Sequence, residues 1–325
     1  MTKRALITGG AGFIGSHVAD RFLADGWTVE IIDNLSSGKR ENVPAGARLH
    51  VLDIGSLDAV HIIAGGRFDA VAHLAAQIDV RRSVNDPVFD AQINILGTLN
   101  LLEAMRAAAT KSAGRFVFAS TGGAIYGDLA TPPTTETTPK DPDSPYGIAK
   151  LAVEKYMGYY SRIHGLETAS VRFSNVYGPR QDPHGEAGVV AIFCGRILSD
   201  RALTVFGDGR QTRDYVYVGD VAEAVFRAAT VALPPRGDVD ARAFNIGTGI
   251  ATSVVDLAST LMRAVNATAP IEFAPSRPGE QMQSFLRVER ARDVLGWTPQ
   301  MPLERGLAKT YAYFAERERP AAARA

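Results

Sequence analysis

Two side chains four residues apart could do acid–base chemistry. Tyr146 and Lys150 stand in "SPYGIAK" (144–150), and if Pro145 opens a helix they share one face. A phenol has a pKa near 10, so Tyr146 can act as a base at neutral pH only if its pKa falls by about three units, roughly 4 kcal/mol. A nearby ammonium and a second positive charge in the same cleft could together supply that energy. The alternative is a solvated helix face, because the Y-x-x-x-K spacing is common by chance.

A glycine-rich turn near the N-terminus is the candidate dinucleotide site. "TGGAGFIGSH" (8–17) follows a short apolar run and precedes an amphipathic stretch, which is the context in which backbone N–H groups and a helix N-terminus bind a pyrophosphate. Gly10, Gly12 and Gly15 give the spacing G-x-G-x-x-G, whereas Gly9, Gly12 and Gly15 give G-x-x-G-x-x-G. The residues alone leave both spacings open.

Two aspartates after predicted strands could bind the adenosine half of a dinucleotide. Asp33 ends the run 28–33, 18 residues after Gly15. Its carboxylate could accept hydrogen bonds from both ribose hydroxyls and would repel a 2′-phosphate, which favours NAD over NADP. A turn-forming aspartate is the alternative. Asp53 could reach the adenine amino group or serve only as a cap.

The pattern of apolar runs predicts the fold. Short apolar runs alternate with amphipathic stretches through the first half of the 325 residues, as in an α/β protein with a doubly wound parallel sheet of the Rossmann type. Longer connections rich in Gly, Pro and Arg follow from about Asn175, where we expect a smaller α/β substrate lobe. We expect an NAD-binding domain over 1–174, completed by a strand near 243–247, a substrate lobe over 175–315, and a tail over 316–325.

Composition argues against several protein classes. The 35 Lys and Arg residues balance 35 Asp and Glu residues, so no global field attracts nucleic acid or an anionic membrane. Cys194 is the only cysteine, which excludes an intramolecular disulfide, and the six histidines lack ligand spacing, so no metal site is expected. We also expect no membrane span and no signal peptide, and therefore a cytoplasmic protein.

Four segments together resemble the extended short-chain dehydrogenase/reductase family. They are "TGGAGFIG" (8–15), "HLAA" (73–76), "YGIAK" (146–150) and "NVYGPRQ" (175–181). Within that family, the chain is similar to the UDP-glucose 4-epimerases from Leu6 to about Phe314. The resemblance implies that Gly9, Gly12 and Gly15 form the phosphate loop. It also implies a tightly bound NAD and the interconversion of UDP-glucose and UDP-galactose through a 4-keto intermediate, with Tyr146 taking the proton of the 4-hydroxyl.

The resemblance also implies a set of site residues. The catalytic residues would be Thr121, Tyr146 and Lys150, with Ser120 as the alternative proton-shuttling hydroxyl because Gly122 stands where many relatives have serine. NAD would contact Gly9, Gly12, Phe13, Ile14, Gly15, Asp33, Asn34, Ser37, Gly38, Asp53, Ile54, Leu74, Ala75, Ala76, Gln77, Asn94, Tyr146, Lys150, Phe173 and Val176. A UDP-sugar would contact Thr121, Tyr146, Asn175, Val189, Val190, Thr204, Phe206, Arg213, Arg277 and Glu280.

Alternative activities remain open. The first alternative is another enzyme of the family that acts on a UDP-sugar, such as a UDP-glucuronate 4-epimerase or a decarboxylase. The second is a non-catalytic NAD-responsive binding protein. The related 4,6-dehydratases carry an adjacent Asp-Glu pair where this chain has Gly122 and Gly123, so dehydration is disfavoured.

Two further expectations follow from the resemblance. Ser284 stands where some relatives hold a bulky tyrosine beside the sugar, so UDP-N-acetylglucosamine could be accepted beside UDP-glucose. The predicted helices near 87–109 and 147–164 resemble a pair that forms a dimer interface in relatives. We therefore expect a homodimer.

Overall fold

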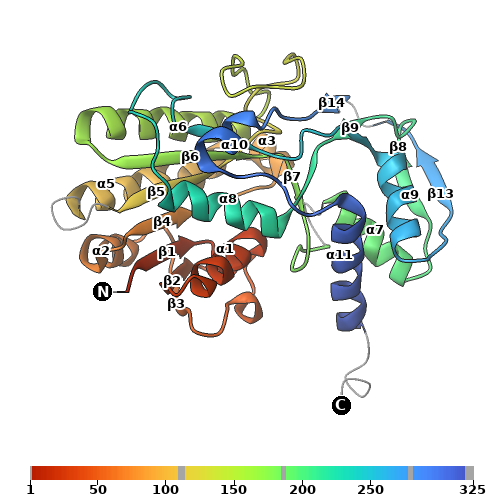
Figure 1. The fold of residues 1–325 in the computed structure, drawn as a ribbon, viewed down its shortest axis with the longest axis horizontal. Helices are drawn as coiled ribbons and strands as arrows, with labels where there is room; N and C mark the ends of the chain where they lie inside the picture. The colour runs from red at the N-terminus through yellow and green to blue at the C-terminus, as the bar shows by residue number, and fades with distance from the viewer. Residues whose placement is uncertain (1, 109–113, 184–187, 277–280, 319–325) are drawn as a thin grey trace.

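A seven-stranded parallel sheet is the centre of the computed structural model, which describes residues 2–108, 114–183, 188–276 and 281–318 (Figure 1). The strand order is β11-β6-β5-β4-β1-β2-β3, and every neighbouring pair is parallel. The strands are β1 (Arg4–Thr8), β2 (Thr28–Asp33), β3 (Arg48–Val51), β4 (Ala70–His73), β5 (Arg115–Thr121), β6 (Glu167–Phe173) and β11 (Ala243–Ile246). The predicted doubly wound Rossmann-type sheet is confirmed.

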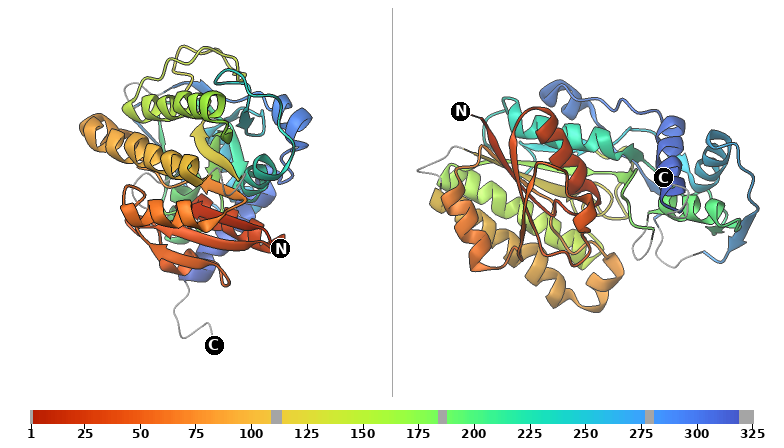
Figure 2. Two further views of the ribbon diagram at one scale, coloured as in Figure 1. Left: turned by 90° about the vertical axis from the view of Figure 1, so that its left-hand side faces the viewer. Right: turned by 90° about the horizontal axis from the view of Figure 1, so that it is seen from below.

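Helices cover both faces of this sheet. One face carries α1 (Phe13–Ala24), α8 (Val218–Thr230) and α10 (Glu289–Leu295), and the other carries α2 (Leu57–Gly66), α5 (Thr98–Ala108) and α6 (Pro145–His164). In the right-hand view of Figure 2, α5 and α6 lie on the side of the sheet opposite α8. Short elements complete this part of the chain: η1 (Arg40–Asn42), α3 (Val80–Asn85), α4 (Pro87–Ala91) and the π-helical η2 (Gln92–Gly97).

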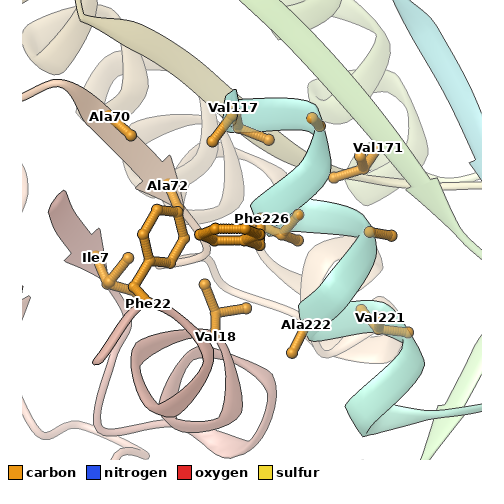
Figure 3. Packing of buried hydrophobic residues seen from close by; sticks show 14 of the residues in the cluster. Ile7, Val18, Phe22, Ala70, Ala72, Val117, Val171, Val221, Ala222 and Phe226 are labelled. Atoms are coloured by element: carbon orange, nitrogen blue, oxygen red, sulfur yellow. The ribbon is translucent and has the colours of Figure 1, made fainter. Parts of the chain in front are cut away.

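Alternating side chains divide the apolar core into two layers. Ile7 and Val117 point toward α1 and α8, where Phe22 and Phe226 pack edge to face with ring centroids 5.1 Å apart (Figure 3). Successive residues of a strand point to opposite faces, so their neighbours Leu6 and Phe116 join the layer with α5 and α6. A strand buried on both faces reads as a continuous apolar run, which is why these strands could be recognised.

A second, smaller lobe lies beside the sheet, to its right in Figure 1. Its apolar core includes Phe193, Leu203, Leu257 and Leu307. The strands are β7 (Asn175–Tyr177) with β10 (Tyr215–Tyr217), β8 (Leu203–Phe206) with β13 (Ile271–Ala274), and β9 (Thr212–Arg213) between β12 (Thr252–Ser253) and β14 (Gln283–Ser284). The helices are α7 (Val189–Leu198), α9 (Val254–Ala264) and α11 (Leu303–Glu318).

Two strands of the sheet lead directly into the smaller lobe. β7 follows the carboxyl end of β6, and β12 follows β11, which pairs with β6 although it lies far along the chain. Residues of the smaller lobe therefore begin at the edge where the carboxyl ends of the strands lie, which is where α/β sheets bind ligands. The domain boundaries at 174 and 315 stay predictions. Among the described helices, none has both the length and the apolar character needed to span a membrane.

Candidate active site

The glycine-rich turn connects β1 to α1, with Gly12 at the helix N-cap position. Gly9 has a φ of +70°, and a Cβ there would lie 2.6 Å from the amide nitrogen of Ala75. A Cβ on Gly15 would lie 2.1 Å from the carbonyl oxygen of Gly9. Both positions abut backbone atoms that cannot move aside, whereas a Cβ on Gly10 would meet only the side chain of Ile31. The geometry supports the spacing that runs through Gly9, Gly12 and Gly15.

Asp33 lies at the carboxyl end of β2 and holds the glycine-rich turn. Its Oδ2 accepts a hydrogen bond of 2.9 Å from the amide of Ala11, and its Oδ1 accepts one of 2.8 Å from Leu35. A Cβ on Gly38 would lie 2.7 Å from this carboxylate. Because a carboxylate has about four acceptor sites, Asp33 can still bind ribose hydroxyls.

Asp53 and Asn34 form a pair at the next strand end. The side-chain amide of Asn34 donates to Asp53 at 2.9 Å, and Asp53 also accepts from the amide of Gly55. The cap of helix α2 is Ser56, which accepts from Ala59. Asp53 is therefore not the helix N-cap, and it stays a predicted adenine contact. Ser37, Gly38 and Ile54 stay predicted NAD contacts.

The Tyr146–Lys150 pair lies in the first turns of α6. Ser144 caps this helix by accepting from the amide of Gly147, and Pro145 is its first residue. The Nζ of Lys150 lies 5.7 Å from the ring centroid of Tyr146. Lys150 is only 4 % exposed and donates a 2.9 Å hydrogen bond to the carbonyl oxygen of Ala119 in β5. Lys150 thus joins helix α6 to β5, two residues before Thr121.

The last two residues of β5 carry hydroxyl groups that differ in accessibility to solvent. Thr121, the last residue of the strand, is half-buried, whereas Ser120 is 3 % exposed and its Oγ has no hydrogen-bond partner among the described residues. Gly122 follows, and a Cβ there would lie 2.5 Å from the side chain of Leu286. Tight packing thus explains why glycine stands at 122, and it leaves Thr121 as the accessible hydroxyl.

A buried polar cluster lies between the ends of β4 and β5 and the start of α6. The backbone amide of Gln77 donates to the side-chain oxygen of Asn94, and the side-chain amide of Asn94 donates to the backbone carbonyl of Gln77. Both hydrogen bonds are 2.9 Å long. Both side chains also donate to Oδ1 of Asp90, which is 1 % exposed. Asp90 was not predicted, and no local motif marks it. Asn94 reaches the cluster from the π-helical turn η2, a geometry that often marks functional sites.

His73, in the "HLAA" segment, was also not predicted as a site residue. It is 1 % exposed and lies between two hydroxyls, with Nδ1 2.6 Å from Thr8 and Nε2 2.9 Å from Thr98. The following residues Leu74 and Ala75 donate their amides to Thr8, so the segment Leu74, Ala75, Ala76 is fixed beside the glycine-rich turn.

Apart from Thr121 and Tyr146, the predicted UDP-sugar residues that the structure describes lie in the smaller lobe. Asn175 begins β7, Arg213 lies in β9, and Thr204 and Phe206 lie in β8. Val189 begins α7, but the side chain of Val190 is buried in the core of the smaller lobe. Arg277 and Glu280 lie outside the described residues. The carboxyl ends of β6 and β11 lead into this lobe. Phe173 is the last residue of β6, and Val176 lies in β7, so both predicted NAD contacts lie where the chain enters the lobe.

A small hollow connects the end of β5 to the smaller lobe. It is lined by Gly122, Gly123, Tyr126 and Ser284, among others. Ser284 pairs in register with Arg213. The hollow therefore joins the residues that follow Thr121 to the strand next to Arg213.

Comparison with known proteins places this arrangement in a family. The model of the NAD dependent epimerase/dehydratase family matches residues 5–247, more than half of the chain. This chain belongs to the NAD dependent epimerase/dehydratase family.

Proteins that resemble this chain over nearly its whole length include several UDP-glucose 4-epimerases. A UDP-glucose 4-epimerase of Mycolicibacterium smegmatis is 45% identical over 96% of this chain and 98% of its own. The structure of UDP-glucose 4-epimerase from Thermotoga maritima with UDP-glucose has a TM-score of 0.89 at 44% identity, covering 97% and 99% of the two chains. That of the Thermus thermophilus enzyme with NAD has a TM-score of 0.87 at 42% identity, covering 98% and 100%.

The dinucleotide that gives the family its name fits the residues present. The amides of Gly9, Ala11 and Gly12 donate within the protein, so the N–H groups in the first turn of α1 are those that would bind a pyrophosphate. Asp33 supplies a carboxylate at the end of β2, where a 2′-phosphate would be repelled. These features favour NAD.

Burial and nearby charges shift the pKa values of both Lys150 and Tyr146. Burial lowers the pKa of Lys150 to about 8, while the carboxylates of Asp90 and Glu154 act in the opposite direction. Burial also raises the pKa of Tyr146, and the charge of Asp90 raises it further. In the protein alone, these effects outweigh any lowering by Lys150. The expected lowering depends on Lys150 and an oxidised nicotinamide together, and it stays a prediction.

Proposed function

We propose that this protein is a UDP-glucose 4-epimerase that interconverts UDP-glucose and UDP-galactose with tightly bound NAD. The observation that carries the proposal is the pair Tyr146 and Lys150, joined through Ala119 to the strand end that carries Thr121. The pair lies in a chain that shares 45% identity with an epimerase over 96% of its length. Because this similarity covers nearly the whole of both chains, the proposal includes the smaller lobe.

Tyr146, Lys150 and Thr121 have different roles in the reaction at C4 of the sugar. Tyr146 accepts the proton of the 4-hydroxyl and later returns one, acting as general base and then general acid. Lys150, with a pKa of about 8, is mainly protonated at pH 7, and its charge stabilises the tyrosinate. Thr121 relays the proton between the sugar and Tyr146. When bound, NAD supplies a hydride acceptor that becomes the donor in the second half of the reaction.

The smaller lobe would bind the UDP part. Arg213 and Arg277 would bind the diphosphate, since the guanidinium fork suits phosphate oxygens. Asn175 would also contact the diphosphate, and Phe206 would lie against the uracil. This leaves the sugar between the lobes, near the end of β5.

The hollow beside Ser284 supports a broader sugar specificity. Ser284 contributes a small side chain to its lining, and a Cβ on Gly123 would meet no atom closer than 3.9 Å. An N-acetyl group at C2 of the sugar would therefore be accepted, so that UDP-N-acetylglucosamine is a second substrate. Turnover of both sugars by the wild type and by Ser284→Tyr tests this, and an unchanged preference in the variant would contradict it.

Exposed apolar side chains on α4, η2 and α6 support a homodimer. They are Val88, Leu96, Ile148, Tyr159 and Ile163, each at least 45 % exposed. Large apolar side chains grouped on neighbouring helices are typical of protein interfaces. Sedimentation should give twice the chain mass, and a monomeric mass would contradict the proposal. The cytoplasmic location stays a prediction.

One incubation separates the proposed reaction from its alternatives. The purified protein is given UDP-glucose, UDP-N-acetylglucosamine or UDP-glucuronate without added cofactor, and products are separated by chromatography. We expect UDP-galactose from UDP-glucose. Conversion of UDP-glucuronate alone would favour the other enzymes of the family, such as the decarboxylase that is 30% identical over 96% of this chain. Bound NAD without any conversion would favour a binding protein.

A further inference from the structure

Asp214 is a buried carboxylate that follows Arg213 directly and has no assigned role. It is 0 % exposed. Its Oδ1 accepts hydrogen bonds from the amide and the hydroxyl of Thr248, at 2.7 and 2.6 Å. Its Oδ2 accepts from the amides of Gly249, at 3.0 Å, and Leu286, at 3.4 Å. All four partners are donors, so the ionised carboxylate is the form that these contacts satisfy.

The loop after β11 is shaped around this carboxylate. A Cβ on Gly247 would lie 2.3 Å from Oδ2 of Asp214, and Gly249 has a φ of +74°. The hydroxyl of Thr248 donates to Asp214 and accepts from the amide of Ile250. Successive backbone amides turned toward one anion form a concave anion site. Here that site is filled by a side chain of the protein itself.

Asp214 connects the segments that carry the predicted UDP-sugar contacts. Its backbone carbonyl accepts a 2.9 Å hydrogen bond from the amide of Asn175. Arg213, next to it, pairs with Thr252 on one side and Ser284 on the other. Three of the carboxylate's bonds hold the loop that leads into Thr252, and one holds the chain two residues after Ser284.

The same carboxylate also reaches the catalytic end of β5 through Leu286. The amide of Leu286 is bonded to Asp214, and its side chain packs against Gly122, the residue after Thr121. A change at Asp214 would therefore loosen both flanks of Arg213 and the packing beside Thr121. Because Asp214 is inaccessible, it acts only through these neighbours.

We propose that Asp214 is a positioning residue for the diphosphate of the substrate. Its carboxylate holds the segments next to the two strands that flank Arg213. Its backbone carbonyl holds Asn175, the first residue of β7. This inference rests on the proposed function and goes beyond it. It assigns UDP affinity to a side chain that does not touch UDP. A purely structural role would change the stability of the protein but leave the affinity of the folded molecules unchanged.

The test uses the NAD-loaded protein and two sets of variants. Asp214→Asn keeps the shape but turns an NH₂ group toward backbone N–H donors, which leaves buried donors unpaired. Thr248→Val removes the hydroxyl donor at nearly constant volume, and Thr248→Ser restores it as the matched control. The dissociation constant of UDP is measured by calorimetry, and KM and kcat are measured with UDP-glucose as substrate. The NAD content is measured after denaturation, and Tm is measured by thermal unfolding.

We expect Asp214→Asn to raise the Kd for UDP and the KM by about tenfold or more, since leaving buried partners unpaired is costly. The kcat should change less, by about threefold at most, and the NAD content should equal that of the wild type. Thr248→Val should weaken UDP binding in the same direction and Thr248→Ser should bind like the wild type.

Folded variants that bind UDP as tightly as the wild type would overturn the inference. If Asp214→Asn does not fold, the Thr248 pair decides, and equal UDP affinity of Thr248→Val and Thr248→Ser would overturn it. The proposed function fails in a different way, because the wild type would then not bind UDP or not convert UDP-glucose.

Discussion

The ammonium group of Lys150 is hydrogen-bonded to the backbone carbonyl of Ala119 at 2.9 Å, two residues before Thr121. This bond joins helix α6, which carries Tyr146, to the strand end that carries the candidate hydroxyl. It fixes a positive charge inside a buried site, where charge interactions are stronger than in water.

Replacing Lys150 tests the role of that charge. Lys150→Met keeps an unbranched apolar chain but removes the ammonium, so tyrosinate loses its fixed counter-charge. We expect kcat for UDP-glucose to fall by about 10²–10⁴, the range of a positioned acid–base group. Lys155→Met, at an exposed position of the same helix, is the matched control and should keep the wild-type kcat. Equal activity in both variants would exclude a catalytic role of Lys150.

Replacing each of the two hydroxyls identifies the proton relay. Thr121→Val removes the accessible hydroxyl at nearly constant shape, and we expect kcat to fall by about 10² or more. Ser120→Ala removes a buried hydroxyl that has no hydrogen-bond partner among the described residues, and kcat should stay within about threefold of the wild type. The reverse order of effects would move the relay to Ser120.

His73 should make the stability of the protein depend on pH. Thr98 donates its hydroxyl to the carbonyl of Asn94, so it accepts from Nε2 of His73, whose Nδ1 accepts from Thr8. Both ring nitrogens are satisfied in the neutral form. Burial, with a smaller contribution from the charge of Lys150, lowers the pKa of His73 to about 3.

The sign of this dependence follows from the proton count. Between about pH 6.5 and pH 3 the unfolded chain binds a proton at His73 and the folded chain does not, so stability falls as the pH falls through this window. We expect His73 to contribute a slope of about 1.4 kcal/mol per pH unit. Urea unfolding at several pH values should show a smaller slope for His73→Gln, with the exposed His61→Gln as control. Equal slopes in all three proteins would contradict a buried neutral His73.

Local features of the sequence predicted much of the fold and part of the site. The parallel sheet could be predicted because doubly buried strands are continuous apolar runs. The Tyr146–Lys150 pair could be predicted because helix geometry fixes neighbours four residues apart. The steric need for glycine at 15 is local, because a Cβ there would meet Gly9 in the same turn, whereas glycine at 9 is required by the distant residue Ala75.

Features that depend on distant contacts could not be predicted. Asp90 affects the pKa of Tyr146 from a separate helix, and the sign of the shift depends on burial, which is set by the whole fold. Arg172, 0 % exposed, binds Glu154 at 2.5 Å between β6 and α6, and nothing in its apolar strand marks it as the centre of an ion pair. The partners of Asp214 come from 34 to 72 residues away. Charge signs and buried polar clusters therefore need the structure.

The most direct measurement of the central claim is the turnover of UDP-glucose by Tyr146→Phe, with NAD content and UDP affinity measured on the same preparation. The variant loses only the hydroxyl that accepts the sugar proton. The account predicts that kcat falls by about 10²–10⁴, while NAD content and UDP affinity stay at wild-type values. Turnover within a few-fold of the wild type would contradict the assignment of Tyr146 as the catalytic base.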